Sequence, residues 1–156
     1  MFYSRSLPVL LALLAVPALA ADQRERVPGP VAAEVLDIVD GDTLSVRVHL
    51  WLGQELHTKV RLDGVDTPEK RSRCDREKEL AREAERHLEG LVVKRRVLLY
   101  NVANDKFGGR VRARVVLPDG TDLAAALVSA GYARPYHGEA RQPWCGGPLA
   151  AAPGGP

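Results

Sequence analysis

Three short stretches of this sequence combine acidic, cationic and glycine residues in patterns that could bind a metal ion and a phosphate. The first is Asp40-Gly41-Asp42-Thr43, in which two carboxylates stand two residues apart. In an extended segment such residues project to the same side, so both can face one ion. Carboxylate oxygens are the ligands of hard cations such as calcium. Asp-Gly-Asp is also a common turn, and the spacing around it is not that of an EF-hand.

The second stretch runs from Arg61 to Glu69 and joins a strand-like pattern to a turn. The guanidinium of Arg61 has the fork geometry that suits a phosphate. Asp66 and Glu69 follow in the turn, with Pro68 stiffening the backbone between them. If the chain returns Asp66 to the side of Asp42, two carboxylates bracket one metal ion and Glu69 is free to hold a water. Taken alone, the stretch is equally a surface turn with an Arg–Asp ion pair.

The third stretch is the glycine-rich run Asp105-Lys106-Phe107-Gly108-Gly109-Arg110. Glycines let a backbone approach a phosphate closely, and Lys106 and Arg110 add positive charge. A hairpin turn explains the run as well.

The formal net charge is only +2, so total charge does not mark a nucleic-acid binder. Local patches such as the one around Arg110 matter more to a polyanion than the total.

Hydrophobic periodicity predicts the elements that must position these groups. Alternation of apolar and polar residues predicts strands near residues 32–39, 44–50, 56–62, 96–102 and 111–117. Helical spacing predicts one helix that contains Leu80 to Leu91, with Asp75 as its N-cap. A second, short helix is predicted over Leu123–Ala130, capped by Thr121 or Asp122. Five strands with a helix between the third and fourth are typical of an OB barrel.

The two ends of the chain differ in composition from this central part. Residues 1–20 have a basic start, an apolar run and an Ala-x-Ala site, which predict a secretory signal peptide, the alternative being a retained anchor. Residues 21–30 are read as a flexible leader, 31–145 as the single folded domain and 146–156 as a disordered tail. We therefore expect export to the periplasm or the medium. There, Cys74 and Cys145 are expected to pair, the alternative being two free thiols.

In order and spacing, the three stretches resemble the staphylococcal nuclease family over roughly residues 31–136. The resemblance implies an α+β fold, a five-stranded OB-fold β-barrel with about three helices. It also implies a calcium-dependent nuclease that hydrolyses phosphodiester bonds of DNA and RNA and leaves 3′-phosphate ends. Nothing in the sequence demands more than a monomer, and no stable membrane association is expected after signal cleavage.

The resemblance assigns a metal-binding role to four residues. Asp42 and Asp66 match carboxylate ligands of Ca²⁺, and the backbone carbonyl of Thr67 matches a main-chain ligand. Asp40 matches an outer carboxylate that acts through water. In this interpretation calcium is the cofactor of the enzyme.

The resemblance assigns catalysis and substrate binding to a second group of residues. Glu69 matches the general base, and Arg61 matches one of two arginines that bind the phosphate. Arg110 is expected to be the second, with Arg112 as the alternative because the additional glycine lengthens the loop before Arg110 by one residue. The residues expected beside the substrate are Lys106, Phe107 and Tyr136, where Phe107 stands in place of a common tyrosine.

Two other classes of function compete with a nuclease. The first is a non-catalytic OB-fold protein that binds nucleic acid or another partner in the cell envelope. The second is a structural domain whose disulfide and acidic residues only stabilise it. A pure binder has no need for Asp42, Asp66 and Glu69 next to arginines, and a structural domain leaves Arg61 without a role.

Overall fold

The computed structural model describes residues 26–92 and 96–145 of the 156-residue chain. The predicted signal peptide, the tail and the first half of the leader lie outside these residues. The elements, in chain order, are β1 (Val31–Asp40), β2 (Thr43–Trp51), β3 (Gln54–Leu62), β4 (Val65–Asp66), α1 (Asp75–Leu91), β5 (Arg96–Asn104), β6 (Arg110–Val116), α2 (Leu123–Ser129) and β7 (Arg134–Pro135). Among the described helices, none is long and apolar enough to cross a membrane.

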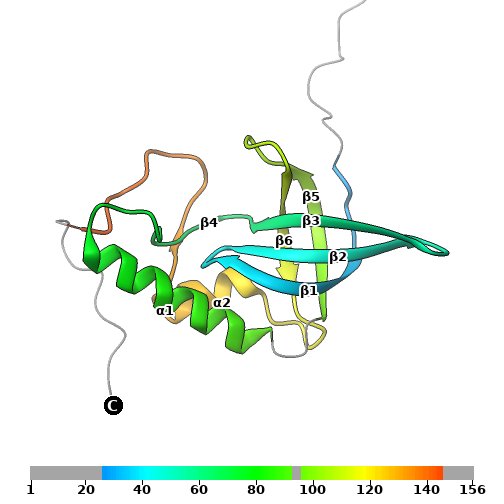
Figure 1. Ribbon diagram of the computed structural model, residues 1–156, viewed down its shortest axis with the longest axis horizontal. Coiled ribbons are helices and arrows are strands. Elements are labelled where there is room, and N and C mark those ends of the chain that lie inside the picture. Colours follow the sequence, from blue (N-terminus) through cyan, green and yellow to red (C-terminus); the bar gives the residue numbers. More distant parts are fainter. Residues whose placement is uncertain (1–25, 93–95, 146–156) are drawn as a thin grey trace, which may run out of the picture.

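Five of the strands close into a barrel in the order β1-β2-β3-β6-β5 (Figure 1). All neighbours are antiparallel except β3 and β6, which run parallel. The five predicted strands agree with these to within two residues at each end. Strands β4 and β7 form a separate two-stranded sheet. The predicted α+β barrel of the OB type is confirmed.

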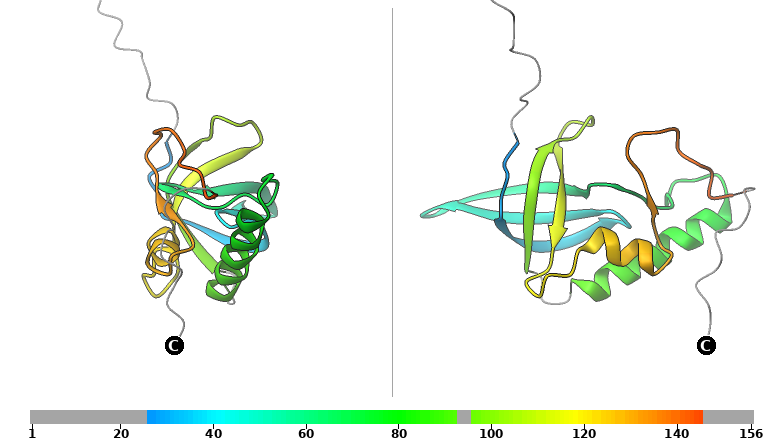
Figure 2. Two further views of the ribbon diagram at one scale, coloured as in Figure 1. Left: turned by 90° about the vertical axis from the view of Figure 1, so that its left-hand side faces the viewer. Right: turned by 180° about the vertical axis from the view of Figure 1, so that it is seen from behind.

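The described part of the chain contains two helices, where about three were expected. The residues after β7, where a third helix would follow, contain Gly138 and Pro143 and show no helical spacing of apolar residues. Glycine costs helical stability, and proline removes a backbone donor. Residues 136–145 therefore run as an irregular segment that returns from α2 to the start of α1 (Figure 2).

The N-terminus of α1 lies one residue earlier than predicted. Cys74, not Asp75, is the N-cap; it has extended backbone angles and makes no side-chain capping bond. Cys74 is bridged to Cys145, with 6.5 Å between the Cα atoms, so the predicted pairing of the cysteines is confirmed. Asp75 instead begins the helix and pairs with Lys78 at 2.8 Å. For α2, Asp122 is the N-cap, since its carboxylate accepts from the backbone N–H of Ala125.

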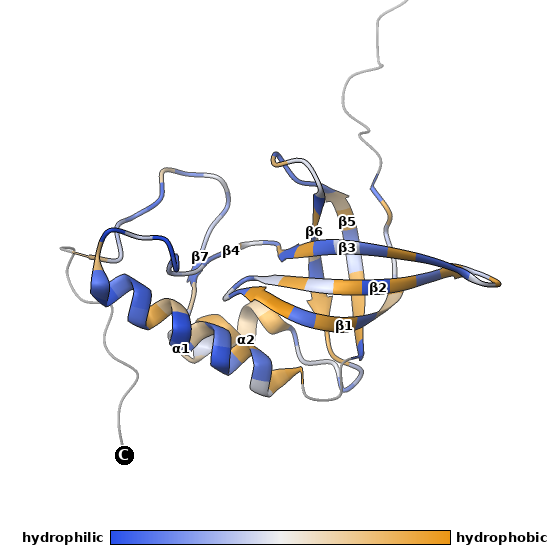
Figure 3. Ribbon diagram, viewed as in Figure 1, coloured by the Kyte–Doolittle hydropathy of each residue, from blue (hydrophilic) through white to orange (hydrophobic). Residues whose placement is uncertain are grey.

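The core fills the barrel with valine and leucine side chains and extends to one face of α1. That helix contributes Ala81, Ala84 and Leu88, which are almost completely buried, while most of its other residues are hydrophilic (Figure 3). Gly41, in the turn between β1 and β2, lies against this face. A Cβ atom added at Gly41 would lie 2.9 Å from the Cβ of Ala84. The small residues on both sides thus let the turn pack closely on α1.

Candidate active site

Two of the three stretches identified from the sequence meet at the same end of the barrel. The antiparallel register of β2 and β3 pairs Thr43 with Arg61. The backbone N–H of Leu62 donates to the carbonyl of Asp42 at 2.8 Å. The β1–β2 turn, which carries Asp42, therefore lies beside the end of β3, from which the chain passes into β4 and Asp66.

Asp42 is buried and both of its carboxylate oxygens have partners. The hydroxyl of Thr43 donates to Oδ1 at 2.8 Å, and Nη2 of Arg61 lies 2.9 Å from Oδ2. The same nitrogen donates to the carbonyl of Val65 at 3.2 Å. A buried carboxylate is costly unless it is paired and hydrogen-bonded, and these contacts meet that need. They also hold Arg61 between Asp42 and the start of β4.

Asp66 is only 4% exposed, and its two oxygens are held by two residues that the sequence reasoning missed. Nε of Arg141 lies 2.6 Å from Oδ1. The indole N–H of Trp144 donates to Oδ2 at 3.2 Å. The signal that could have identified both was their position just before Cys145, whose partner Cys74 follows Glu69 by five residues.

Arg141 also contacts the Thr67 carbonyl, which was expected to bind the metal, and Glu69, which was expected to be the general base. Its Nη2 donates to the carbonyl of Thr67 at 3.0 Å, and its Nη1 forms an ion pair with the carboxylate of Glu69. Burial alone lowers the pKa of Arg141, but the hydrogen bonds and charges of Asp66 and Glu69 outweigh it and raise that pKa above its ordinary value. The guanidinium therefore stays charged and draws three oxygen groups together.

The loop that carries Glu69 is fixed by Glu77 in the first turn of α1. The backbone N–H of Glu69 donates to Oε1 of Glu77 at 3.1 Å, and the hydroxyl of Ser72 donates to its Oε2 at 2.6 Å. The side chain of Glu69 itself is 59% exposed. A base that takes a proton from water needs such access together with a fixed backbone.

Asp40 faces a different partner from Asp42. Its Oδ1 lies 3.5 Å from Nζ of Lys70, which also donates to the carbonyl of Val39 at 2.7 Å and to Glu85 at 3.0 Å. Burial lowers the pKa of Lys70, while Glu85 and Asp40 raise it, and the net shift is upward. Asp40 is thus paired with Lys70, which also contacts Glu85 on α1, and it lies at the edge of the acidic site.

The glycine-rich loop presents a cluster of cations around an exposed ring. Nζ of Lys106 lies 5.2 Å from the ring centre of Phe107, and Cζ of Arg110 lies 4.9 Å from it. Arg110 also forms an ion pair with Asp105. Phe107 is 56% exposed, so its ring is available to a flat partner such as a base.

The parallel pairing of β3 and β6 brings both candidate arginines to the face of Arg61. Arg112 pairs with Arg61 in the register, and Arg110 pairs with Lys59, two residues away on the same face. Arg112 is 3.1 Å from Asp63. Tyr136 lies beside the acidic turn, where its backbone N–H donates to the carbonyl of Gly64 at 2.9 Å.

The donor set at this site is chemically suited to calcium. Asp66 and the Thr67 carbonyl supply hard oxygen atoms that already converge on one positively charged group. Calcium takes six to eight oxygen ligands, of which water can supply several. In the described residues, no cluster of three or more His, Cys, Asp or Glu side chains stands ready to hold a metal. Two carboxylates and a carbonyl do not require such a cluster.

A comparison with protein families agrees with this arrangement. The model of the family described as staphylococcal nuclease homologue matches residues 59–144, more than half of the chain. The matched part includes Arg61, Asp66, Glu69 and Arg110, and it begins after the turn that carries Asp42. No curated protein matches the sequence. With its closed five-stranded barrel and this match, the chain belongs to the staphylococcal nuclease homologue family.

Proposed function

We propose that this protein is an exported, calcium-dependent nuclease that hydrolyses phosphodiester bonds of DNA and RNA and leaves 3′-phosphate ends. Membership of a family of nuclease type supports the reaction class. The observation that carries the proposal is the contact of Arg61 with both Asp42 and the Val65 carbonyl, next to Asp66. Arg141 in turn joins Asp66 to Glu69. The Cys74–Cys145 disulfide supports export, since such bonds persist in oxidising compartments.

In the proposed mechanism, each residue has a separate task at the phosphate. Asp42, Asp66 and the Thr67 carbonyl would hold calcium, which supplies positive charge beside the phosphate when bound. Glu69 accepts the proton of the attacking water. Arg61 and Arg110 bind the phosphate oxygens on which negative charge grows. Arg61 has five donors, so its bond to Asp42 leaves others for the phosphate.

Lys106, Phe107 and Tyr136 are proposed to bind the rest of the substrate. Lys106 would contact a neighbouring phosphate, and the exposed ring of Phe107 would stack on a base. Asp40 would act through water at the edge of the site. Because these contacts are mostly to phosphates and base faces, both DNA and RNA are expected to be substrates.

The direct test is cleavage of single-stranded DNA and of RNA by purified mature protein. We expect cleavage with calcium, none with EGTA, and 3′-phosphate ends that block polymerase extension until a phosphatase removes them. Cleavage that persists in EGTA would remove calcium from the proposal. Retention of the oligonucleotide without cleavage would instead support the alternative, a non-catalytic OB-fold binder.

A further inference from the structure

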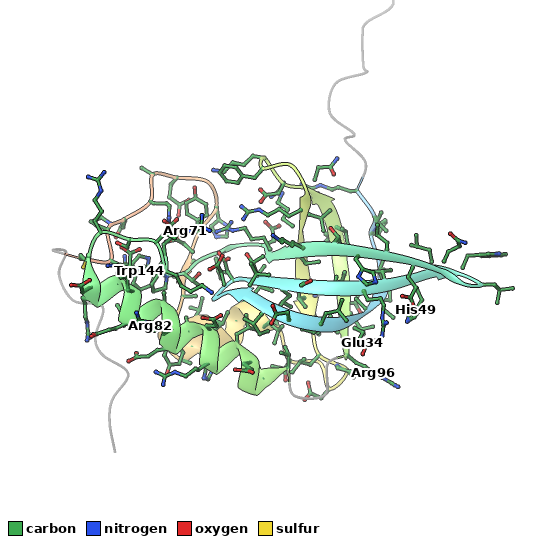
Figure 4. All side chains as sticks on the ribbon, in the orientation of Figure 1. Glu34, His49, Arg71, Arg82, Arg96 and Trp144 are labelled. Carbon is green, nitrogen blue, oxygen red and sulfur yellow. A yellow bond between two sulfur atoms is a disulfide. The ribbon has the colours of Figure 1, made fainter. Side chains whose placement is uncertain are left out.

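The segment Arg141–Cys145, here called the clasp, is anchored to the acidic site at several points. Trp144 donates to Asp66, and its ring lies 3.8 Å below the guanidinium of Arg134. Arg134 also donates to the carbonyl of Pro143 at 3.2 Å. The disulfide from Cys145 ties the end of the clasp to the N-cap of α1, and Figure 4 shows Trp144 beside the first turn of that helix.

Arg141, the first residue of the clasp, brings one positive charge to the acidic site. Arg141 is 39% exposed along its side chain, but its three guanidinium nitrogens are directed to Asp66, Thr67 and Glu69. Two of these three groups, Asp66 and the Thr67 carbonyl, are the ones assigned above to calcium. The remaining carboxylate, Asp42, is neutralised by Arg61. Asp42, Asp66 and Glu69 thus each have an arginine of this chain as their cation.

The oxygens that Arg141 binds are the ones a metal would need. The ion pair between Nε of Arg141 and Oδ1 of Asp66, at 2.6 Å, places the guanidinium against this oxygen. Two cations in contact with the same oxygens repel each other strongly in a buried site. A calcium ion on these oxygens would therefore compete with Arg141, whereas the indole N–H of Trp144 contacts the other oxygen, Oδ2.

We propose, on the basis of the function proposed above, that the clasp is an autoinhibitory device built into the fold. Arg141 is the resident cation of the acidic site, and calcium binds by displacing it. Trp144 is a positioning residue that keeps the Asp66 carboxylate aligned in both arrangements. Since Arg141 is held near the site by a disulfide only four residues away, its effective concentration is high and lowers the apparent affinity for calcium.

The test measures calcium affinity by titration calorimetry on the full mature protein, independently of activity. Arg141→Gln is expected to bind calcium about tenfold or more tightly than the wild type, because removing a competing charged contact of ~1.5–3 kcal/mol tightens binding by at least that factor. Arg71→Gln is the matched control, since it removes one charge from the neighbouring exposed loop, and it should bind calcium like the wild type. Arg141→Gln should also melt at a lower temperature than the wild type in EDTA.

Trp144 provides a second readout of the displacement. Trp51 is 77% exposed, so Trp51→Phe leaves Trp144 as the single tryptophan of the folded part. In that background, calcium should change the Trp144 emission as Arg141 leaves Asp66. When Arg141→Gln is added to Trp51→Phe, the calcium-induced change in emission should fall to a small fraction of the change seen with Trp51→Phe alone.

The outcomes separate the clasp from the nuclease itself. If the wild type cleaves with calcium but Arg141→Gln has the same calcium affinity, the clasp is overturned and the proposed function stands. If the wild type, Arg71→Gln and Arg141→Gln all fail to bind calcium, the proposed function falls and the clasp with it. Tighter binding by Arg141→Gln alone supports the clasp.

Discussion

At the scale of single residues, the site combines buried carboxylates with arginines from distant parts of the chain. Asp42 and Asp66 are 8% and 4% exposed, and each is paired with a guanidinium. Removing one partner of a buried pair leaves an uncompensated charge, whereas an exposed carboxylate is easily replaced. Glu69 is the exposed acid of this set, so its chemistry can be tested without unfolding the protein.

Glu69→Gln is expected to lower kcat by about a hundredfold or more, the usual effect of losing a positioned general base. The amide keeps the size of the side chain, and the melting temperature should change little. Initial rates on single-stranded DNA with saturating calcium measure the effect. Glu89→Gln, on the exposed side of α1, is the control and should cleave normally. A Glu69→Gln enzyme of near wild-type rate would exclude Glu69 as the base.

The two candidate arginines of β6 can be separated by a paired substitution. Arg110→Ala is expected to lower kcat by about a hundredfold, as for loss of a donor to the transition state. Arg112→Ala should change kcat by less than about fivefold, because its guanidinium pairs with Asp63 at the surface, a contact that contributes ~1 kcal/mol or less to stability and none to the reaction. The same kinetic assay measures both. The reverse order of effects would assign the phosphate to Arg112, the register partner of Arg61.

At the scale of elements, the site depends on two turns packed against one helix. The β1–β2 turn carries Asp42 and touches α1 through Gly41, while the β3–β4 segment carries Asp66 and Thr67. Gly41 lies close to both, because an added Cβ would be 3.4 Å from the Thr67 side chain as well as 2.9 Å from Ala84. Packing at this point therefore sets the separation of the two acidic turns.

Gly41→Ala is expected to destabilise the fold by about 1–3 kcal/mol, the usual effect of overpacking a tight contact. It should also weaken calcium binding, because the turn that holds Asp42 must shift. Adding Ala84→Gly removes the opposing Cβ and should recover part of the calcium affinity, although glycine in a helix costs ~1 kcal/mol. Denaturant unfolding and calorimetry measure both effects.

Gly90→Ala in α1, the helix that contains Ala84, is the control for the Gly41→Ala prediction. A Cβ at Gly90 meets no atom within 4 Å, so this variant should be as stable as the wild type or slightly more so. If Gly41→Ala and Gly90→Ala unfold at the same denaturant concentration, the close packing of the turn on α1 does not matter for stability.

At the scale of the whole molecule, the proposed binding of nucleic acid is expected to depend on positive charge on one face of the barrel. The formal net charge is +2, yet Arg61 and Arg110 lie on one face of the neighbouring strands β3 and β6, and Lys106 lies in the loop that leads into β6. Association with a polyanion releases counterions in proportion to the phosphates contacted. A small protein with a nearly neutral total charge can therefore still bind nucleic acid with a clear dependence on salt.

The affinity of the inactive Glu69→Gln protein for a single-stranded oligonucleotide should fall with salt with a slope of roughly −2 on logarithmic axes, as for three phosphate contacts at about −0.7 each. Lys106→Gln should reduce the magnitude of that slope by about 0.7, the loss of one contact. Fluorescence anisotropy between 50 and 200 mM salt, roughly a fourfold range, measures both values. A slope near zero would exclude phosphate contacts as the main source of affinity.

The sequence by itself determined the barrel, the long helix and the acidic and cationic stretches of the site. Strand alternation and helical spacing are local properties, which is why the strands were predicted to within two residues at each end. The Asp40–Thr43 and Arg61–Glu69 stretches also meet through a local event, the pairing of two strands joined by a short hairpin. The correct register of this strand pair is almost sufficient to bring the two stretches together.

The tertiary structure alone decided the partners of Asp66 and Glu69 and the place where the last segment lies against the acidic site. Arg141 contacts Thr67 across 74 positions of the sequence, and no periodicity links residues so far apart. Cys74, the N-cap of α1, is tied to Cys145, which lies 71 positions later in the sequence. Contacts of this kind depend on the closure of long loops onto a completed barrel, and that closure follows from the packing of the whole chain.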